Sequence, residues 1–274
     1  MIDLRTFAMV TGKELRLMRR YPLSLANSLV LTPLYQLVLP ALLLGAAFLV
    51  QGQALGMSAL TGTTDFAGWL AIGMVGAIVT STALAGPARA MMGERDSGTL
   101  EQTWAMPLSR SSMVLGVMSG MIVLSLVSAA LMVGTVALLF GARYRPGAFL
   151  SLPVLAVLVI GLVGMGYMSA SLALLWRQAS GITDNLGYVV TILSGVTFPV
   201  VALSAALQPV SWLIPTTWAI DLARHFSLGA DTLLPVPFEA AALVLTSAVY
   251  ALIGRLMFAK TEKKLRADGR LAQH

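Results

Sequence analysis

Six long apolar segments, separated by short polar stretches, set the pattern of this chain. They are residues 25–50, 66–90, 113–140, 148–175, 185–203 and 236–259. A helix of about 20 apolar residues is long enough to cross the hydrocarbon core of a bilayer. The pattern therefore predicts an all-α integral membrane protein with six transmembrane helices over residues 25–259, in a single domain that spans residues 1–274. Charged residues are almost absent from the six segments, so no relay of ionisable groups is visible in them.

Residues 1–22 have a different pattern, with apolar and basic side chains on opposite sides of a helix except at Ile2, Met9 and Glu14. The apolar side holds Leu4, Phe7, Val10, Leu15, Leu17 and Met18, and the basic side holds Arg5, Lys13, Arg16, Arg19 and Arg20. A basic amphipathic helix of this kind lies in the membrane interface and does not cross the bilayer. The alternative is an ordinary positively charged tail. Pro22 separates this region from the first predicted span.

The distribution of basic residues predicts how the chain is oriented. Of the 18 lysines and arginines, fifteen fall on one side of the predicted spans, and the three on the other side are Arg143, Arg145 and Arg224. Basic residues are enriched in cytoplasmic loops, so both termini, the 91–112 and 176–184 loops and a tail over residues 260–274 are expected in the cytoplasm. The net charge of +6 is explained by the inner membrane surface, and no nucleic-acid partner is expected.

Composition argues against several kinds of site. With no cysteine and only two histidines, the chain is not expected to hold a disulfide framework or a metal site. It has no G-x-x-x-x-G-K-[S/T] string, the loop that cradles nucleotide phosphates, and we expect no cofactor bound by this chain. An intramembrane enzyme built on Ser180, Asp184 and His225 is disfavoured, because the orientation places the first two residues inside and His225 outside.

A polar stretch over residues 94–107, ERDSGTLEQTWAMP, separates the second and third spans. Gly93 and Gly98 are expected to break the preceding helix, and Pro107 is expected to stop the next one. Between Gly98 and Pro107, Thr99 and Gln102 have the spacing of a capping box. The pattern predicts a short helix outside the membrane, from Thr99 to Met106.

On this helix Leu100 and Trp104 are four residues apart and share one face, while Glu101 and Gln102 point elsewhere. A small apolar face with an acidic edge suits a groove on a partner protein. The alternative is a solvated loop that only joins two spans.

A second informative stretch, residues 194–224, follows the fifth span. It is partly apolar, and the residues that interrupt or mark it are Pro199, Pro209, Pro215, Trp212 and Trp218. A helix with these prolines cannot be one straight span, so we expect broken helices that dip partway into the bilayer from outside.

This stretch is predicted to act as an extracellular gate through Pro199, Pro215, Asp221 and Arg224. The two prolines set the turns, and Asp221 and Arg224 are three residues apart, so they are expected to pair on a helix surface. The alternative is an outer cap that only adds stability.

Both stretches resemble the signatures of the type-2 permeases of ATP-binding-cassette transporters. In the first stretch the matching residues are Glu94, Gly98, Thr99, Leu100, Glu101, Pro107 and Arg110. In the second they are Gly195, Pro199, Leu207, Gln208, Pro209, Pro215, Ala219, Ile220, Asp221 and Arg224. Ser204 departs from the pattern, because many relatives have a second proline there.

The resemblance implies that the 94–107 stretch contains a coupling helix, which docks on a separate ATPase subunit that binds ATP and Mg. The residues expected to couple are Glu94, Gly98, Thr99, Leu100, Glu101, Trp104 and Pro107. The resemblance further implies an exporter with two permease chains, identical or different, in the cytoplasmic membrane of a bacterium or archaeon.

An apolar pathway without charged positions favours amphiphilic or lipid-like cargo, such as drugs, antibiotics, lipids or glycolipids. The alternative function is a secondary transporter or channel that needs no ATPase. Such proteins normally show intramembrane ionisable residues or two repeated halves, and the sequence has no such repeat.

Overall fold

The computed structural model describes residues 3–21, 23, 26–31, 35, 58, 61–99, 102, 109–176 and 179–268. The described residues form helices and their connections, with no strand among them, which confirms the all-α prediction for this part of the chain. In chain order the helices are α1 (Leu4–Arg20), η1 (Asn27–Leu31), α5 (Phe66–Asp96), α7 (Arg110–Phe140), η2 (Pro146–Leu150), α8 (Ser151–Leu175), α9 (Ala179–Leu193), η3 (Val200–Ala202), α10 (Gln208–Trp212), α11 (Pro215–Leu228) and α12 (Val236–Asp268).

Four of the described helices are long and apolar enough to cross a membrane: α5, α7, α8 together with η2, and α12. They correspond to the second, third, fourth and sixth predicted spans. The first predicted span, 25–50, lies mostly outside the described residues. The six-span topology therefore stays a prediction.

The fifth span differs from its predicted range of 185–203. Helix α9 begins earlier, at Ala179, and ends at Leu193. Gly195 follows in the left-handed backbone region, at φ 74°, which turns the chain out of the helix. Residues 194–198 form turns and bends, in which the apolar side chain of Val196 is buried although it is not in a helix.

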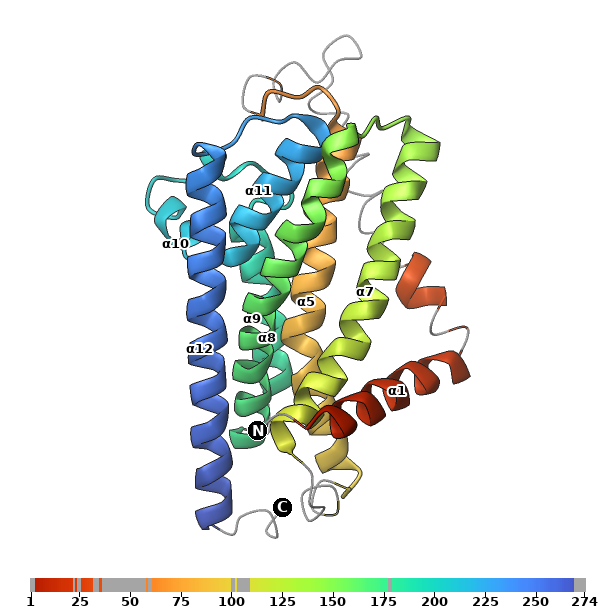
Figure 1. The fold of residues 1–274 in the computed structure, drawn as a ribbon, viewed down its shortest axis with the longest axis vertical. Coiled ribbons are helices and arrows are strands. Elements are labelled where there is room, and N and C mark those ends of the chain that lie inside the picture. The colour runs from red at the N-terminus through yellow and green to blue at the C-terminus, as the bar shows by residue number, and fades with distance from the viewer. Residues whose placement is uncertain are drawn as a thin grey trace.

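Helix α5 lies in the middle of the bundle, with α7, α8, α9 and α11 packed around it (Figure 1). Its hydrophobic side chains are buried on most sides, as in Leu70, Val79 and Ala83. A helix that is apolar all round is stable when its neighbours cover every face. The main core joins α5 to the surrounding helices through the buried side chains of Met118, Leu158, Leu162, Leu222 and Phe258.

Small residues set the closest helix contacts. A Cβ atom at Gly164 of α8 would overlap the backbone at Tyr250 of α12, and one at Gly254 would overlap the backbone of Gly164. On α7, a Cβ at Gly116 or Gly120 would overlap α1. The absence of a side chain at these glycines therefore lets the helices approach closely.

Helix α1 lies across the lower end of α7 (Figure 1). Asp3 caps its first turn, because the Asp3 carboxylate accepts hydrogen bonds from the Thr6 hydroxyl at 2.6 Å and the Arg5 N–H at 3.0 Å. These bonds, the Thr6 one first, hold the pKa of Asp3 below its ordinary value. The predicted N-terminal helix is confirmed as a helix.

The side of α1 that faces α7 differs from the predicted apolar side. It includes Thr11, whose hydroxyl lies 2.6 Å from the Ser119 hydroxyl, and the stem of Glu14, which packs at Gly120. Leu4 and Leu15 remain exposed. The apolar side is therefore divided between α7 and the surroundings, because the helix packs on the edge where small residues of α7 let it approach. The exposed leucines suit contact with lipid.

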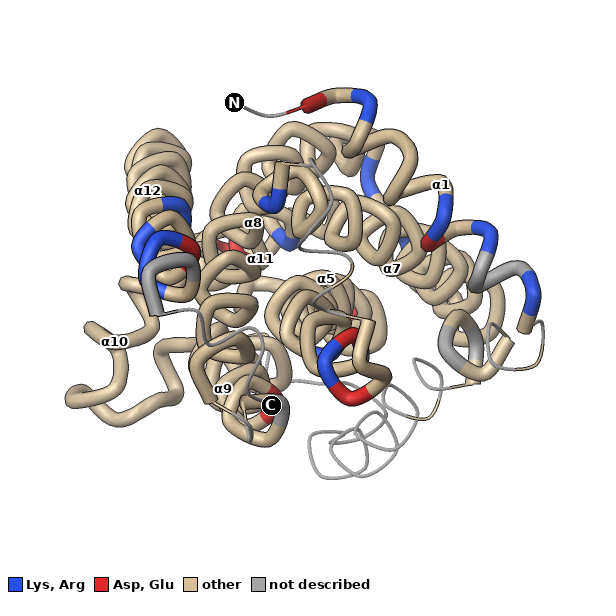
Figure 2. The backbone as a smooth tube through the Cα atoms, turned by 90° about the horizontal axis from the view of Figure 1, so that it is seen from below, with Lys and Arg blue, Asp and Glu red and all other residues tan. Residues whose placement is uncertain are grey.

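Most of the described lysines and arginines gather at the lower end of the bundle, on α1, the end of α5 and the end of α12 (Figure 2). Arg143 and Arg145 lie at the opposite end, between α7 and η2. The structure thus groups the basic residues by end as the sequence predicts, and we call the basic end the inner end.

Candidate functional site

The predicted coupling stretch begins where α5 ends. The helix continues to Asp96, so Gly93 lies inside it and does not break it, contrary to the prediction. Gly98 does end the helix: it has φ 68°, and its N–H donates to the Arg95 carbonyl at 3.0 Å. The Thr99 N–H then donates to the Glu94 carbonyl at 2.9 Å. Glycine at this position relieves the steric cost of the left-handed turn.

Glu94 itself lies in the last turn of α5 and is half-buried. Lys13 and Glu14 of α1 lie within electrostatic range of its carboxylate. Arg95, beside it, donates to the Ala173 carbonyl near the end of α8 at 3.3 Å. The start of the coupling stretch is therefore tied to α8 by Arg95, and the charges of α1 act on its Glu94 carboxylate.

The middle of the stretch lies outside the described residues. This includes four of the predicted coupling residues, Leu100, Glu101, Trp104 and Pro107. The helix predicted from Thr99 to Met106 therefore stays a prediction. Of the residues after Thr99, the structure describes Gln102, which is exposed.

The stretch ends at a second fixed point, the start of α7. The Ser109 hydroxyl caps this helix by accepting from the Ser112 N–H at 3.4 Å. The Ser112 hydroxyl accepts from the Asp3 N–H of α1 at 2.7 Å. Arg110, part of the family-like signature, pairs with Glu262 of α12 at 2.9 Å, and both side chains are largely buried. α1 and α12 therefore both contact the residues at which the stretch ends.

A further ion pair joins helices at the inner end. Arg89 of α5 donates to the carboxylate of Asp184 of α9 at 2.9 Å. Asp184 pairs with Arg89, whereas the His225 ring contacts the Ala230 carbonyl, so the catalytic triad considered from the sequence is not assembled. In the described part of the chain, no group of three or more His, Cys, Asp or Glu side chains is arranged to hold a metal ion.

The stretch over residues 194–224 is broken as predicted, and we call residues 194–235 the outer segment. Pro199 precedes η3, and Pro215 occupies the first turn of α11, where its missing N–H costs little. α11 is tied back to α10 by two bonds: the Thr217 hydroxyl donates to the Ser211 carbonyl at 2.7 Å, and the Trp218 indole N–H donates to the Trp212 carbonyl at 2.9 Å. The prolines therefore mark helix boundaries. Entry of the segment into the bilayer stays a prediction.

Arg224 is arranged differently from its prediction. Its side chain is 3% exposed, and its guanidinium donates to the carbonyls of Trp69, Gly195 and Val196 at 3.1, 2.8 and 2.7 Å. The guanidinium carbon also lies 3.2 Å from the centre of the Trp69 ring. Arginine suits such a site, because its planar guanidinium can stack on an aromatic ring and carries several donors in a fixed arrangement.

The predicted surface pair between Asp221 and Arg224 is therefore wrong. Asp221 accepts from the Leu233 N–H at 2.9 Å instead. Arg224 turns inward because α11 packs on α5, where free backbone carbonyls at the end of α9 need donors. Arg224 thus joins α5, the turn after α9 and α11.

Three of the four predicted gate residues meet at one place. Pro199, Asp221 and Arg224 line a polar cavity of about 140 Å³ at the outer end, together with Trp69 and Asp231. Pro215, the fourth, is buried at the start of α11 and does not line it.

Two residues of this region were missed from the sequence, Trp69 and Glu239. Glu239 is fully buried in the first turn of α12, where one carboxylate oxygen accepts from the Leu234 N–H at 2.9 Å. Asp221 lies beside it. A lone carboxylate within a predicted span was the signal for Glu239, whereas a tryptophan among apolar residues gives no signal of its own.

A family model described as ABC-2 type transporter matches residues 6–227. No curated protein matches the chain. The matched range begins in α1 and ends in α11, so it contains the coupling stretch and the predicted gate residues, with α12 beyond its end.

Proposed function

Because this chain belongs to the ABC-2 type transporter family, we propose that it is the membrane-spanning subunit of an ATP-driven exporter. Membership of the family makes the chain a transport subunit and not a catalytic one. The family match over most of the chain carries the proposal, and the four long apolar helices support it.

Energy for export would come from a separate ABC ATPase subunit, which binds ATP and Mg. The support is the 94–107 stretch, which leaves α5 at an exposed turn and returns at the capped start of α7. A stretch between two fixed ends can transmit a push from a docked partner to the helices that hold it. The coupling residues remain those predicted, led by Leu100 and Trp104.

The docking is tested by co-purification with the cognate ATPase. Replacing both Leu100 and Trp104 with Asp should dissociate the complex, because burying two such side chains contributes roughly 3–6 kcal/mol. Gln102→Asp is the matched control, since it adds a charge to the same stretch away from the predicted apolar face. Retention of the ATPase by the double variant would remove the docking assignment.

The proposed assembly contains two permease chains and two ATPases in the cytoplasmic membrane of a bacterium or archaeon. Both termini would lie in the cytoplasm, because the basic end of the bundle carries α1 and the end of α12 (Figure 2). The cargo would be amphiphilic or lipid-like, such as a drug, antibiotic, lipid or glycolipid, since the long helices are apolar.

Release of cargo would pass an outer gate that includes Pro199, Asp221 and Arg224. These residues line one cavity between η3, α11 and α5, so a shift of the outer segment would change it. Pro199→Ala should lower transport in reconstituted vesicles while ATP hydrolysis and assembly persist. A parallel fall in transport, hydrolysis and thermal stability would instead make the segment a stabilising cap.

One observation favours the alternative of a secondary transporter. Glu239 is a fully buried carboxyl group beside Asp221, and buried ionisable groups in membrane helices often carry protons or ions. Transport driven by a proton gradient in vesicles without any ATPase would support this alternative. Transport that requires ATP and the ATPase would reject it.

A further inference from the structure

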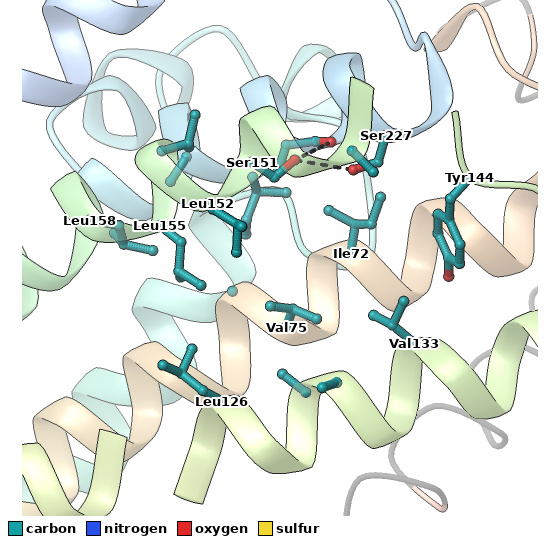
Figure 3. Close-up of a pocket in the computed structure, with 18 residues that line it drawn as sticks. Ile72, Val75, Leu126, Val133, Tyr144, Ser151, Leu152, Leu155, Leu158 and Ser227 are labelled. Atoms are coloured by element: carbon teal, nitrogen blue, oxygen red, sulfur yellow. Dashed lines mark hydrogen bonds between the residues drawn. The ribbon is translucent and has the colours of Figure 1, made fainter. Parts of the chain in front are cut away.

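A second cavity, of about 460 Å³, lies between α7 and α8 away from the coupling stretch and the predicted gate. Side chains from different helices converge on it, as Figure 3 shows for Ile72 and Val75 of α5, Leu126 and Val133 of α7, and Leu155 of α8. Ile220 and Ala223 of α11 complete its wall.

The cavity is a long apolar slot. Its lining on α8 runs from Ser151 to Leu158 and on α7 from Leu126 to Val133, which is about 10 Å at 1.5 Å per residue. Its volume falls in the range of about 300–1,000 Å³ that is usual for ligand pockets. Apolar cavities stay free of water and accept apolar molecules, so a water column is a poor occupant.

Among the residues that the structure describes, none closes one side of the slot. Ala130 of α7 and Leu152 of α8 line it and are exposed on the surface of the described structure. Both helices belong to the candidate membrane spans. A molecule in the surrounding hydrocarbon could therefore enter between α7 and α8 without crossing water.

The outer end of the slot is polar. The hydroxyl oxygens of Ser151 and Ser227 lie 3.1 Å apart, and Ser151 also donates to the Ala223 carbonyl at 3.4 Å (Figure 3). The phenol oxygen of Tyr144 is buried and has no hydrogen-bond partner among the described residues. Burial, with a smaller effect of Asp65, raises the pKa of Tyr144 to about 12. The phenol thus keeps its proton and is a donor that lacks an acceptor.

We propose that this slot binds one hydrocarbon chain of an amphiphile, whose head group accepts a hydrogen bond from Tyr144. The apolar wall takes the chain, and the polar end meets the head group at the level where α7 ends and α8 begins. A single ligand then fills the apolar volume with its hydrocarbon chain and accepts a hydrogen bond from the Tyr144 phenol with its head group. The chain can come from a membrane lipid or from exported cargo, and binding of the former needs no ATPase.

The test is photolabelling of the full chain in nanodiscs. The probe is a phospholipid that carries a diazirine in its acyl chain, and adducts are mapped by peptide mass spectrometry. We expect adducts on α7 near residues 126–133 and on α8 near residues 151–158. Val133→Trp should fill the slot and reduce this labelling by about tenfold, because a well-packed site loses its occupant. Leu138→Trp is the control, since Leu138 is 87% exposed on the same helix and does not line the slot.

Tyr144→Phe tests the polar end without a change in shape. Loss of one hydrogen bond should weaken labelling by about fivefold, with no loss of thermal stability. The proposal is overturned if Val133→Trp and Leu138→Trp label equally, or if Tyr144→Phe raises thermal stability and leaves labelling unchanged. The second result would mean that the phenol has no ligand to bind.

A transport arm separates the two sources of the chain. Transport is measured in vesicles that contain the ATPase. If the Val133→Trp variant exports cargo at the parental rate, the slot is a site for membrane lipid. Loss of export with continued ATP hydrolysis indicates that the cargo's chain uses the slot. Labelling requires no ATPase, so its failure is distinct from a failure of the proposed exporter function.

Discussion

Arg224 shows how one residue can organise the outer end of the bundle. A buried guanidinium is costly unless its donors are paired, and here three carbonyls from α5 and from the turn after α9 accept them. The residue therefore fastens α11 to two segments that are distant in sequence. Its contribution is tertiary anchoring, and any role in gating would act through that anchor.

Replacement of Arg224 should destabilise the protein. Arg224→Ala removes the guanidinium that donates to three buried carbonyls, for an expected loss on the order of 3 kcal/mol and a fall of about 5 °C or more in Tm. Arg224→Lys should recover only part of this loss, because one ammonium cannot reach all three carbonyls or stack on Trp69 as a guanidinium does. Tm in detergent is the measurement.

The exposed Arg143 provides a control for the loss of a positive charge at the same end. Arg143→Ala should leave Tm nearly unchanged. Equal Tm values for the Arg224 and Arg143 variants would contradict the anchoring role.

At the scale of elements, helix pairing depends on small residues and on helix ends. α8 and α12 meet where Gly164 and Gly254 leave room for the opposing backbone. Away from that contact, Arg110 and Glu262 join the start of α7 to the last turns of α12. Close packing in the bundle and an ion pair near the inner end thus hold α12 by two different kinds of contact.

A side chain at the α8–α12 contact should separate the helices. Gly164→Leu and Gly254→Leu each place new atoms against backbone, which cannot move aside as a flexible side chain can. We expect destabilisation of about 1–3 kcal/mol, or more where the helices cannot shift. The measurement is Tm together with the monodisperse fraction in size-exclusion chromatography.

Gly134 of α7 is the matched control, because a Cβ there meets no atom within 4 Å. Gly134→Leu should retain the parental Tm. If all three leucine variants behaved alike, close packing at the α8–α12 contact would not be a source of stability.

For the whole molecule, the separation of charge between the two ends predicts the orientation. The inner end carries α1, the coupling stretch and the last turns of α12, whereas the outer end carries the 194–235 segment (Figure 1). Because loops rich in basic residues stay on the cytoplasmic side of the membrane, the elements at the inner end should be inaccessible from outside the cell.

Single cysteines test this orientation in a chain that has none of its own. Cysteines at Ser97, Gln178 and Gln273 should be protected from a membrane-impermeant thiol reagent in intact cells, whereas cysteines at Gln53, Gly147 and Asp231 should react. Ser97 and Asp231 are the sharpest pair, because both are exposed, and Ser97 caps the inner end of α5 while Asp231 lies in the outer connection between α11 and α12. Permeabilised cells, where all exposed sites should react, provide the control. The reverse pattern would invert the proposed topology.

Local features of the fold were predictable from the sequence. Long apolar runs located α5, α7, α8 and α12, and the turn at Gly98 and the boundary at Pro215 followed from the conformational limits of glycine and proline. The two stretches that resemble the family, residues 94–110 and 195–224, are likewise recognised from residues that are close together in the chain. Each of these conclusions needs only neighbours within a few positions, which is why the sequence alone was sufficient.

Only the tertiary structure decided the rest. The early end of α9, the inward turn of Arg224 and the division of the apolar side of α1 depend on partners far away in the chain. The slot between α7 and α8 likewise needs side chains from four helices, because residues of α5 and α11 complete its wall. Apolar side chains look alike in a sequence whether they fill a core, face lipid or line a cavity, so their use is determined by which helices pack together and how closely they approach.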